Sequence, residues 1–215
     1  YDNGKVEFYG RMSYMKAGLV YADIISTVSE TYADEIQTEE YGYGFDGIIR
    51  AGKDRLRGII NGIDYEANNP ETDKRIDVNY SADNAEAKKE NKRLLQERLG
   101  LEQRGVPMIC MISRLADQKG LDILANAMER LMQNDIQFVI LGTGEKRYED
   151  MFRYYENRWK GRFCSCIMFD DTLAQKIYAS GDMFLMPSRF EPCGLGQMFS
   201  LRYGTVPVVR KTGGL

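Results

Sequence analysis

From Met108 onward, short apolar segments alternate with amphipathic segments, and this alternation constrains the fold more than any other feature of the chain. The apolar segments are Met108–Ile112, Gln137–Leu141, Arg162–Phe169, Met183–Met186 and Val206–Val209. They are almost continuously apolar, as in parallel strands that are buried on both faces. Helices are predicted between them over Leu121–Gln133, Glu145–Lys160, Thr172–Ala179 and Leu195–Tyr203. The pattern predicts an α/β fold with a Rossmann-like, doubly wound parallel sheet, in which ligands bind beyond the carboxyl ends of the strands.

The first third of the chain has a less regular pattern. Its predicted elements are a helix over Tyr14–Asp23, a strand over Ile24–Val28, a helix from the N-cap Ser29 through Glu39, a glycine-aromatic loop over Tyr41–Gly47, a tight turn at Asn61-Gly62 and a charged helix over Glu86–Leu99. The chain begins with Tyr1 rather than Met, which indicates an internal piece of a longer protein. We expect a domain boundary near Arg57, with residues 1–57 as the tail of one domain and residues 58–215 as another.

The composition is that of an ordinary globular protein. A chain of 215 residues can hold one full α/β domain and part of a second, and 43% hydrophobic residues suffice for a core. The net charge of −3 and the lack of a basic stripe argue against nucleic acid as a partner. The longest aliphatic runs, such as Phe138–Leu141, are too short to span a bilayer, and residues 1–20 show no signal peptide, so no membrane partner is expected.

The cysteines and histidines restrict the chemistry. The four cysteines are Cys110, Cys164, Cys166 and Cys193; they form no C-x-x-C pair, and the chain has no histidine. This spacing does not fit a zinc site. Free, buried thiols in a reducing cytoplasm are therefore expected. Any general acid or base in this chain must be a residue other than histidine, so its chemistry depends on carboxylates, cations and backbone groups.

Two cations flank the turn that follows the first predicted strand. Arg114 and Lys119 lie in the segment Ser113–Gly120, just before the helix that starts at Leu121. A helix start offers free N–H groups and a partial positive charge, so this arrangement could clamp a diphosphate. The alternative is a surface turn with solvated charges. The segment Leu141-Gly142-Thr143-Gly144 also follows a strand but lacks the third glycine of the dinucleotide spacing, so it is either a second phosphate turn or only a tight turn.

The loop around Glu191 has a more specific pattern. In Glu191-Pro192-Cys193-Gly194-Leu195, a carboxylate precedes a Pro-braced turn into a helix, so backbone N–H groups could hold sugar hydroxyls or phosphate beside it. A carboxylate favoured only by the helix dipole is the alternative. Lys211-Thr212-Gly213-Gly214 repeats the theme after the next strand. Because these turns share one edge of the predicted sheet, we expect the basic pair and the acidic loop to meet at a site for a charged, sugar-bearing nucleotide.

Other features allow two interpretations each. Five acidic residues, Glu30, Asp34, Glu35, Glu39 and Glu40, are predicted to form a solvated helix face. The aromatic loop Tyr41–Phe45 could stack against sugar rings or could be a plain connection. Phe169, at the end of a predicted strand, could stack on a base or could be an aromatic at the edge of the core.

Taken together, these segments resemble the bacterial glycogen synthase and plant starch synthase family of retaining glucosyltransferases. The resemblance covers nearly the whole chain: Lys16-Ala17-Gly18-Leu19, Thr27-Val28-Ser29, Asn61-Gly62-Ile63-Asp64, Asn69-Pro70-Glu71-Thr72-Asp73, Glu90-Asn91-Lys92, Ser113-Arg114-Leu115, Gln118-Lys119-Gly120-Leu121-Asp122, Pro187-Ser188-Arg189-Phe190-Glu191-Pro192-Cys193-Gly194-Leu195 and Thr212-Gly213-Gly214-Leu215. The longest of these strings is highly specific. The family implies a GT-B architecture, with the active site between two Rossmann-like halves.

The resemblance assigns a role to each candidate residue. Residues 1–57 would end the acceptor-side domain, and residues 58–215 would form a donor nucleotide-sugar-binding domain truncated at its C-terminus. Arg114 and Lys119 would hold the diphosphate of ADP-glucose, and Glu191 would lie beside the transferred glucose. The remaining donor-binding candidates are Ser113, Gly142, Gly144, Phe169 as the residue that stacks on adenine, Cys193, Gly194, Leu195, Thr212, Gly213 and Gly214. The partners implied are ADP-glucose, an α-1,4-glucan and the absent N-terminal domain, without cofactor or metal, in the cytoplasm or in a plastid.

Two positions depart from the family pattern. Gly196 stands where the family often has a hydroxyl residue, and Phe199 stands where related transferases carry a second acidic residue. A non-catalytic nucleotide-sugar or glucan-binding module with the same fold is the alternative function. The retained charges of Arg114, Lys119 and Glu191 favour the enzyme.

Overall fold

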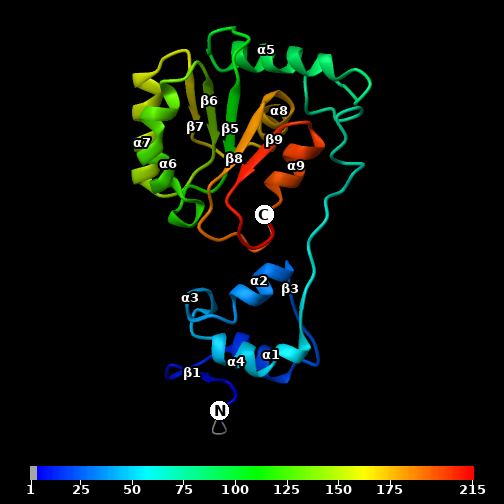
Figure 1. Ribbon diagram of the computed structural model, residues 1–215, viewed down its shortest axis with the longest axis vertical. Coiled ribbons are helices and arrows are strands. Elements are labelled where there is room, and N and C mark those ends of the chain that lie inside the picture. The colour runs from blue at the N-terminus through cyan, green and yellow to red at the C-terminus, as the bar shows by residue number, and fades with distance from the viewer. Residues whose placement is uncertain (1–3) are drawn as a thin grey trace. The chain divides into compact units, whose positions relative to one another are not determined.

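The computed structural model describes residues 4–215, which form two compact units (Figure 1). The first unit contains Tyr1–Asn61, Glu191–Gly194 and Lys211–Leu215, of which residues 1–3 lie outside the described part, and the second contains Gly62–Phe190 and Leu195–Arg210. The sequence predicted one division, between residues 57 and 58. The two compact units divide between Asn61 and Gly62, and the loops Glu191–Gly194 and Lys211–Leu215, which follow β8 and β9, group with the first unit. That the chain divides into an acceptor-side and a donor-binding domain at residue 57 stays a prediction.

The second unit is built on the predicted parallel sheet. Its strands are β5 (Met108–Ile112), β6 (Gln137–Leu141), β7 (Phe163–Cys166), β8 (Met183–Met186) and β9 (Val206–Val209). They lie in the order β7-β6-β5-β8-β9 with every neighbouring pair parallel, which confirms the doubly wound α/β fold. The chain moves outward from β5 through β6 to β7 and then returns to β8 on the other side of β5. The β5–β8 junction is therefore the topological switch point, where ligands bind in such sheets.

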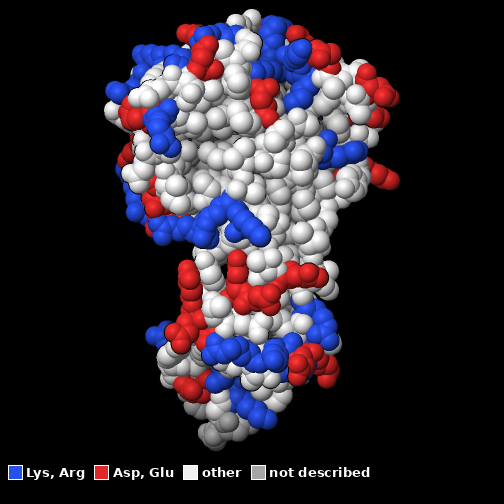
Figure 2. Space-filling model, in the orientation of Figure 1, with Lys and Arg blue, Asp and Glu red and all other residues white. Residues whose placement is uncertain are grey.

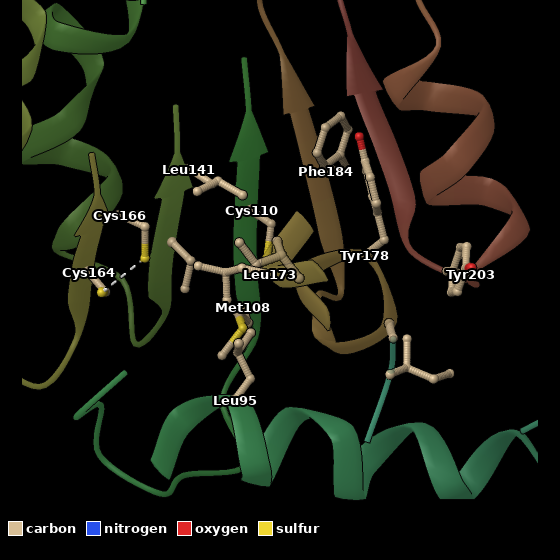
Figure 3. Packing of buried hydrophobic residues seen from close by; sticks show 14 of the residues in the cluster. Leu95, Met108, Cys110, Leu141, Cys164, Cys166, Leu173, Tyr178, Phe184 and Tyr203 are labelled. Carbon is tan, nitrogen blue, oxygen red and sulfur yellow. Dashed lines mark hydrogen bonds between the residues drawn. The ribbon is translucent and has the colours of Figure 1, made fainter. Parts of the chain in front are cut away.

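Helices cover both faces of this sheet. The helices of the second unit are α5 (Lys88–Arg98), α6 (Leu121–Met132), α7 (Lys146–Arg158), α8 (Asp171–Ser180) and α9 (Gly196–Arg202). Figure 1 shows α6 and α7 on one face and α8 and α9 on the other. Along β5, Met108 and Cys110 join the core under α8, while Ile109 and Met111 join the core under α6. Because both faces of the central strands β5 and β6 are buried, these strands need no polar alternation, whereas the edge strand β9 is largely exposed. Figure 3 shows the first of these cores, with Leu95 of α5 beside Met108 at the start of β5.

The predicted strand over Arg162–Phe169 was too long at both ends. β7 stops at Cys166, because the following residues leave the sheet to start α8, where the Asp170 carboxylate accepts from the Leu173 amide at 2.9 Å. Cys164 and Cys166 point to one face of β7 with their sulfur atoms 3.8 Å apart (Figure 3). All four cysteines are free and buried, as predicted.

The first unit contains short elements around a small core. They are β1 (Glu7–Phe8), β2 (Arg11–Met12), α1 (Tyr14–Tyr21), β3 (Ile25–Thr27), α2 (Glu30–Glu35), α3 (Glu39–Gly42), α4 (Asp46–Ala51) and β4 (Leu56–Gly58). β1 and β2 form an antiparallel hairpin, and β3 pairs with β4 in parallel. The buried apolar residues are Ile25, Ala33, Ile49 and Leu56. Ser29 caps α2 as predicted, since its hydroxyl accepts from the Tyr32 amide at 3.1 Å.

Three predictions for this region were wrong. The helix from Ser29 does not continue through Glu39 but ends at Glu35, and a new helix begins at Glu39. The predicted loop Tyr41–Gly47 contains the end of α3 and the start of α4. A Cβ on Gly42 would lie 2.5 Å from the Cβ of Asp46, so this glycine allows the two helices to approach. The Asn61-Gly62 pair forms no turn and lies in irregular backbone.

Candidate active site

At the switch point, the basic turn after β5 is held against the loop after β8. The Arg189 amide donates to the Gln118 carbonyl at 2.8 Å, and the Gln118 side-chain amide donates to the Phe190 carbonyl at 3.2 Å. Gly120 adopts a φ of +67°, and a Cβ there would lie 2.0 Å from the Pro187 carbonyl oxygen, so glycine is required. The turn that carries Arg114 and Lys119 therefore contacts the residues that lead directly into Glu191.

The Gly-Thr-Gly segment after β6 supports the same turn. A Cβ on Gly142 would lie 1.9 Å from the Ser113 carbonyl oxygen, and one on Gly144 would lie 2.2 Å from the Leu115 carbonyl oxygen. The Leu115 amide donates to the Thr143 carbonyl at 2.9 Å. These glycines let two backbones meet at the sheet edge. Their role in the second unit is thus to position Ser113 and Arg114.

A cavity of about 650 Å³ opens at this carboxyl edge within the second unit. Four predicted donor-binding residues line it: Ser113, Arg114, Gly142 and Phe169. Phe169 is 93% exposed, so the alternative that it is a core-edge aromatic is wrong. Lys119 and Gly144 lie on the adjoining turns and do not line the cavity.

The cavity wall also contains polar residues that the sequence analysis missed. Arg75 lines it together with Asn68 and Gln175. Gln175 is only 4% exposed, and its Oε1 atom is buried without a hydrogen-bond partner among the described residues. Asn68 and Arg75 lie in the polar segment between β4 and α5, and Gln175 lies on the buried face of α8. None of the three belongs to a recognisable sequence motif. Only the packing of α8 brings them to the cavity.

The two arginines of the cavity differ in how their charges are matched. The hydrogen bond from Arg75 to Asp73 raises the pKa of Arg75, and a further bond at 3.1 Å joins Arg75 to Asp171. Arg114 is exposed and donates to the neutral Gln118 side chain at 3.2 Å, and within the described residues no ion pair forms on it. A ligand anion in this cavity would therefore meet the charge of Arg114 first.

Acidic residues brace the basic turn from outside the cavity. Hydrogen bonds from the Tyr148 hydroxyl and the Arg147 guanidinium lower the pKa of Asp117, which opens the short 3₁₀ turn Asp117–Lys119. The Arg189 guanidinium lowers the pKa of Asp122, with the two charges 2.5 Å apart. Both carboxylates are therefore ionised at neutral pH. Asp117 ties the turn after β5 to α7, and Asp122 ties the start of α6 to the loop after β8.

The acidic loop and the last Gly-rich turn pack against each other in the first unit. Glu191 is 7% exposed, and its carbonyl accepts from the Gly214 amide at 3.1 Å. A Cβ on Gly213 would lie 1.8 Å from that same carbonyl oxygen, and Gly213 has a φ of +50°. Cys193 and Thr212 are buried as well. The two loops thus form one backbone-packed structure.

Helix α2 anchors this structure. Glu35 accepts from the Thr212 hydroxyl at 2.8 Å and from the Gly213 amide at 3.0 Å, and the Ser29 hydroxyl donates to the Pro192 carbonyl at 2.6 Å. The prediction that Glu35 belongs to a solvated helix face was therefore wrong. Its partners lie far along the chain, so no local pattern could have identified it.

The presence of glycine at position 196, where the family often has a hydroxyl residue, has a steric explanation. Leu195, which is 43% exposed, precedes α9 in the second unit, and Gly196 is its first residue. A Cβ on Gly196 would lie 2.9 Å from the ring of the fully buried Phe184. A hydroxyl residue does not fit there without moving that ring.

The predicted site residues therefore fall into two groups. The second unit holds Ser113, Arg114, Lys119, Gly142, Gly144, Phe169 and Leu195, and the first unit holds Glu191, Cys193, Gly194, Thr212, Gly213 and Gly214. That both groups bind one donor molecule stays a prediction. Throughout residues 4–215, every helix is too short or too polar to cross a lipid bilayer.

Comparisons with known proteins identify the family. Residues 1–51 match the family described as the starch synthase catalytic domain, and residues 106–215 match the family described as glycosyl transferases group 1. A glycogen synthase of Thermosipho melanesiensis is 58% identical over 100% of this chain, which spans 45% of that relative. A glycogen synthase of Thermosipho africanus is also 58% identical over the whole chain, which spans 44% of it.

A solved structure agrees over the same length. One solved structure is the catalytic domain of starch synthase IV from Arabidopsis thaliana, bound to ADP and acarbose. It superposes with a TM-score of 0.91 at 36% identity, and the match covers 98% of this chain and 44% of the starch synthase chain. A sucrose-phosphate synthase from Thermosynechococcus elongatus superposes with a TM-score of 0.63 at 18% identity, and the match covers 99% of this chain and 48% of the synthase chain. At this identity the likeness shows the fold alone. The chain, which spans less than half of each of these relatives, therefore belongs to the glycosyl transferases group 1, in the glycogen synthase and starch synthase family with the GT-B fold.

Proposed function

We propose that the protein containing this chain transfers glucose from ADP-glucose to the non-reducing end of an α-1,4-glucan, glycogen or starch, with retention of configuration. The observation that carries the proposal is the 58% identity to a glycogen synthase along the entire chain. The ADP and acarbose bound to the related starch synthase support a nucleotide donor and a glucan acceptor. Because the chain spans 45% of that glycogen synthase, the activity belongs to the whole protein, and the 215 residues alone are expected not to turn over.

The chemistry requires positive charge at the leaving group. When the bond between glucose C1 and the diphosphate oxygen breaks, negative charge develops on the diphosphate and positive charge on the sugar ring. Arg114 and Lys119 would stabilise the diphosphate, and each contact could lower the barrier by about 3 kcal/mol. These two side chains would supply the charge that a metal ion supplies in other transferases, so we propose a reaction that needs no metal.

A single carboxylate shapes the proposed course of the reaction. Retaining glycosidases place two carboxylates about 5 Å apart, whereas Phe199 stands here where related transferases have a second acidic residue. We propose that the acceptor hydroxyl attacks C1 on the face from which the diphosphate departs. The leaving phosphate oxygen accepts the proton of that hydroxyl. Glu191 would bind a glucose hydroxyl beside the reacting carbon.

The cavity of the second unit fits the nucleotide part of the donor. Its exposed aromatic, Phe169, offers a face on which a base can stack, and Arg114 offers the charge for a phosphate. A volume of about 650 Å³ is typical of small-molecule sites. We propose that adenine of ADP-glucose lies against Phe169.

The surface of the first unit supports a further domain as its partner. Helix α1 has no buried residue, and Tyr14 and Met15 are 84% and 65% exposed. The parallel pair β3–β4 is too small to be stable by itself. We propose that the N-terminal domain of the same protein covers these groups. The free thiols support a reducing compartment, and we propose the cytoplasm.

The test is glucose transfer by the full-length protein with ADP-glucose and glycogen. We expect chain elongation that is faster with ADP-glucose than with UDP-glucose, and no turnover by the 215-residue chain. Glu191→Gln should reduce kcat by a factor of about 100 or more, while the exposed Glu30→Gln should match the unsubstituted enzyme. If the full-length protein bound ADP and glucan without transfer, it would be a non-catalytic module.

A further inference from the structure

A second cavity, of about 640 Å³, lies within the second unit at the opposite, amino-terminal edge of the sheet. Helix α5 forms one wall, and the end of α8 and the segment before β5 form the others. Asp182, which precedes β8, lines it, whereas the donor cavity is lined by residues that follow β5, β6 and β7. No residue lines both cavities. A ligand bound here would therefore not overlap the proposed donor.

The ionisable residues that line this cavity are mainly cations. Its ionisable lining residues are Lys88, Lys89, Lys92, Arg93, Arg104 and Asp182, which are five cations and one carboxylate. Four of the cations belong to α5. Lys88 and Lys92 are four residues apart, as are Lys89 and Arg93, so each pair lies on one face of the helix. Figure 2 shows Lys and Arg side chains gathered at the top of the second unit, where Figure 1 draws α5, with a few carboxylates among them.

Two of these cations are held in place by the protein. The Lys88 ammonium donates to the carbonyls of Tyr178 and Tyr203 at 3.1 and 2.9 Å, where α8 and α9 end. Lys92 pairs with Asp182 at 2.6 Å. Burial lowers the pKa of Lys88 to about 8. Lys88 and Lys92 thus form a fixed positive floor.

The other three cations are bound only weakly. Lys89 pairs with Glu86, Arg93 with Glu90 and Glu97, and Arg104 with Asp135 and Glu102. These five carboxylates are exposed by 84%, 46%, 62%, 62% and 54%. Exposed pairs of this kind contribute little to stability, so a ligand anion can replace the carboxylates. The guanidinium groups of Arg93 and Arg104 can each bind two oxygens of one anion.

A buried hydroxyl also lacks a partner here. Ser180 lines the cavity and is 1% exposed, and its Oγ atom has no hydrogen-bond partner among the described residues. A buried polar atom of this kind is costly unless a ligand or water satisfies it. The cavity therefore combines two cations held in place by the protein, three cations whose carboxylate partners a ligand anion can replace, and a buried hydroxyl group without a partner among the described residues.

We propose that this cavity is a second ligand site of the protein, which binds a small phosphorylated metabolite. Phosphate groups fit the lining, because they offer several charged acceptor oxygens to Lys and Arg donors at once. The volume accommodates the non-phosphate part of a small molecule. The residues of this site are separate from those of the proposed donor site, so the proposal does not depend on the transferase activity.

The test uses the full-length protein with inorganic pyrophosphate as the probe. Calorimetric titration is done at saturating ADP, so that the donor site is already occupied. We expect saturable binding that weakens as salt rises. The double variant Lys89→Gln/Arg93→Gln should weaken it by a factor of about 10 or more, because two charge-assisted contacts are lost. Arg104→Gln, on a different segment, should weaken it by a factor of about 10 as well.

The matched control is Lys146→Gln/Arg153→Gln on α7. These two cations also pair with carboxylates along their own helix, and they lie outside both cavities. The change in net charge is the same as in the α5 variant, so a general electrostatic effect would weaken binding equally in both. The proposal is overturned if the unsubstituted protein shows no saturable binding at saturating ADP, if the α5 variant and Arg104→Gln bind normally, or if the α7 variant is weakened to the same extent.

Discussion

Glu35 accepts a hydrogen bond from the Thr212 hydroxyl at 2.8 Å, although the two residues are 177 positions apart in the sequence. The same carboxylate oxygen accepts from the Gly213 amide, and its other oxygen, Oε2, is buried without a hydrogen-bond partner among the described residues. Helix α2 thereby holds in place the turn Thr212–Gly214, to which the family resemblance assigns donor binding. This contact links the position of α2 to the shape of the proposed site.

Replacing Glu35 should therefore disturb the Thr212 turn. In the full-length protein, Glu35→Ala removes the acceptor of two hydrogen bonds, each worth about 1.5–3 kcal/mol when one partner is ionised. We expect faster hydrogen exchange at the Gly213 amide and a fall in kcat/KM for ADP-glucose by a factor of about 10 or more. The control is Glu30→Ala at an exposed position of the same helix. Unchanged exchange at Gly213 would contradict the anchoring role.

Gly142→Ala should displace the turn that carries Arg114. The added Cβ would lie 1.9 Å from the Ser113 carbonyl oxygen, and backbone cannot rotate away as a side chain can. We expect a loss of about 1–3 kcal/mol in stability from overpacking, together with weaker binding of ADP. Thermal unfolding and calorimetry would measure the two effects. The control is Gly62→Ala, where the new methyl group meets nothing within 4 Å and stability should be unchanged.

Phe169→Ala should weaken nucleotide binding without destabilising the protein. The ring is 93% exposed, so its removal leaves no cavity in a core. Loss of stacking on a base should cost about 1–3 kcal/mol of ADP affinity, measured by calorimetry. The comparison variant is Tyr154→Ala, an aromatic that is 56% exposed and lies outside the donor cavity. Equal ADP affinity in both variants would refute the stacking role.

The Asp73–Tyr203 contact should set part of the acid stability. Burial raises the pKa of Asp73, but hydrogen bonds from Arg75 and from the Tyr203 hydroxyl outweigh it and hold the pKa below its usual value. The stability from this group is therefore present above the unfolded pKa, about 3.9, and is lost as the pH falls through the lower folded pKa.

Tyr203→Phe removes one of these donors and should raise the folded pKa of Asp73. We expect a loss of about 1–3 kcal/mol at neutral pH, and a decline of Tm that begins at a higher pH on acidification. Tm measured across the acidic range would show both. Tyr154→Phe, at an exposed position, serves as the control and should keep the original pH profile.

The strands of the donor-side sheet were predictable from the chain alone. β5, β6, β8 and β9 begin and end at the predicted residues, because each is a short, mainly apolar run bounded by residues that leave the sheet. For β5 and β6 the reason is burial on both faces, whereas β9 is apolar but largely exposed. The basic turn and the Glu191 loop were found for the same reason, since each follows directly after such a strand. The sequence predicted one helix from Ser29 through Glu39, whereas the structure has two short helices, α2 and α3. The break between two such short helices was not predicted correctly from local sequence alone.

Other features depend on segments that are distant in the sequence. Phe169 leaves the sheet because Asp170 caps α8, Gly142 and Gly144 are required by the backbone of a neighbouring loop, and Glu35 is bonded to a turn near the other end of the chain. The five cations of the second cavity come from α5 and from the segment before β5, and only packing places them around one volume. Local patterns record which residues are buried along a strand or helix, whereas contacts between loops arise only when the sheet brings their ends together.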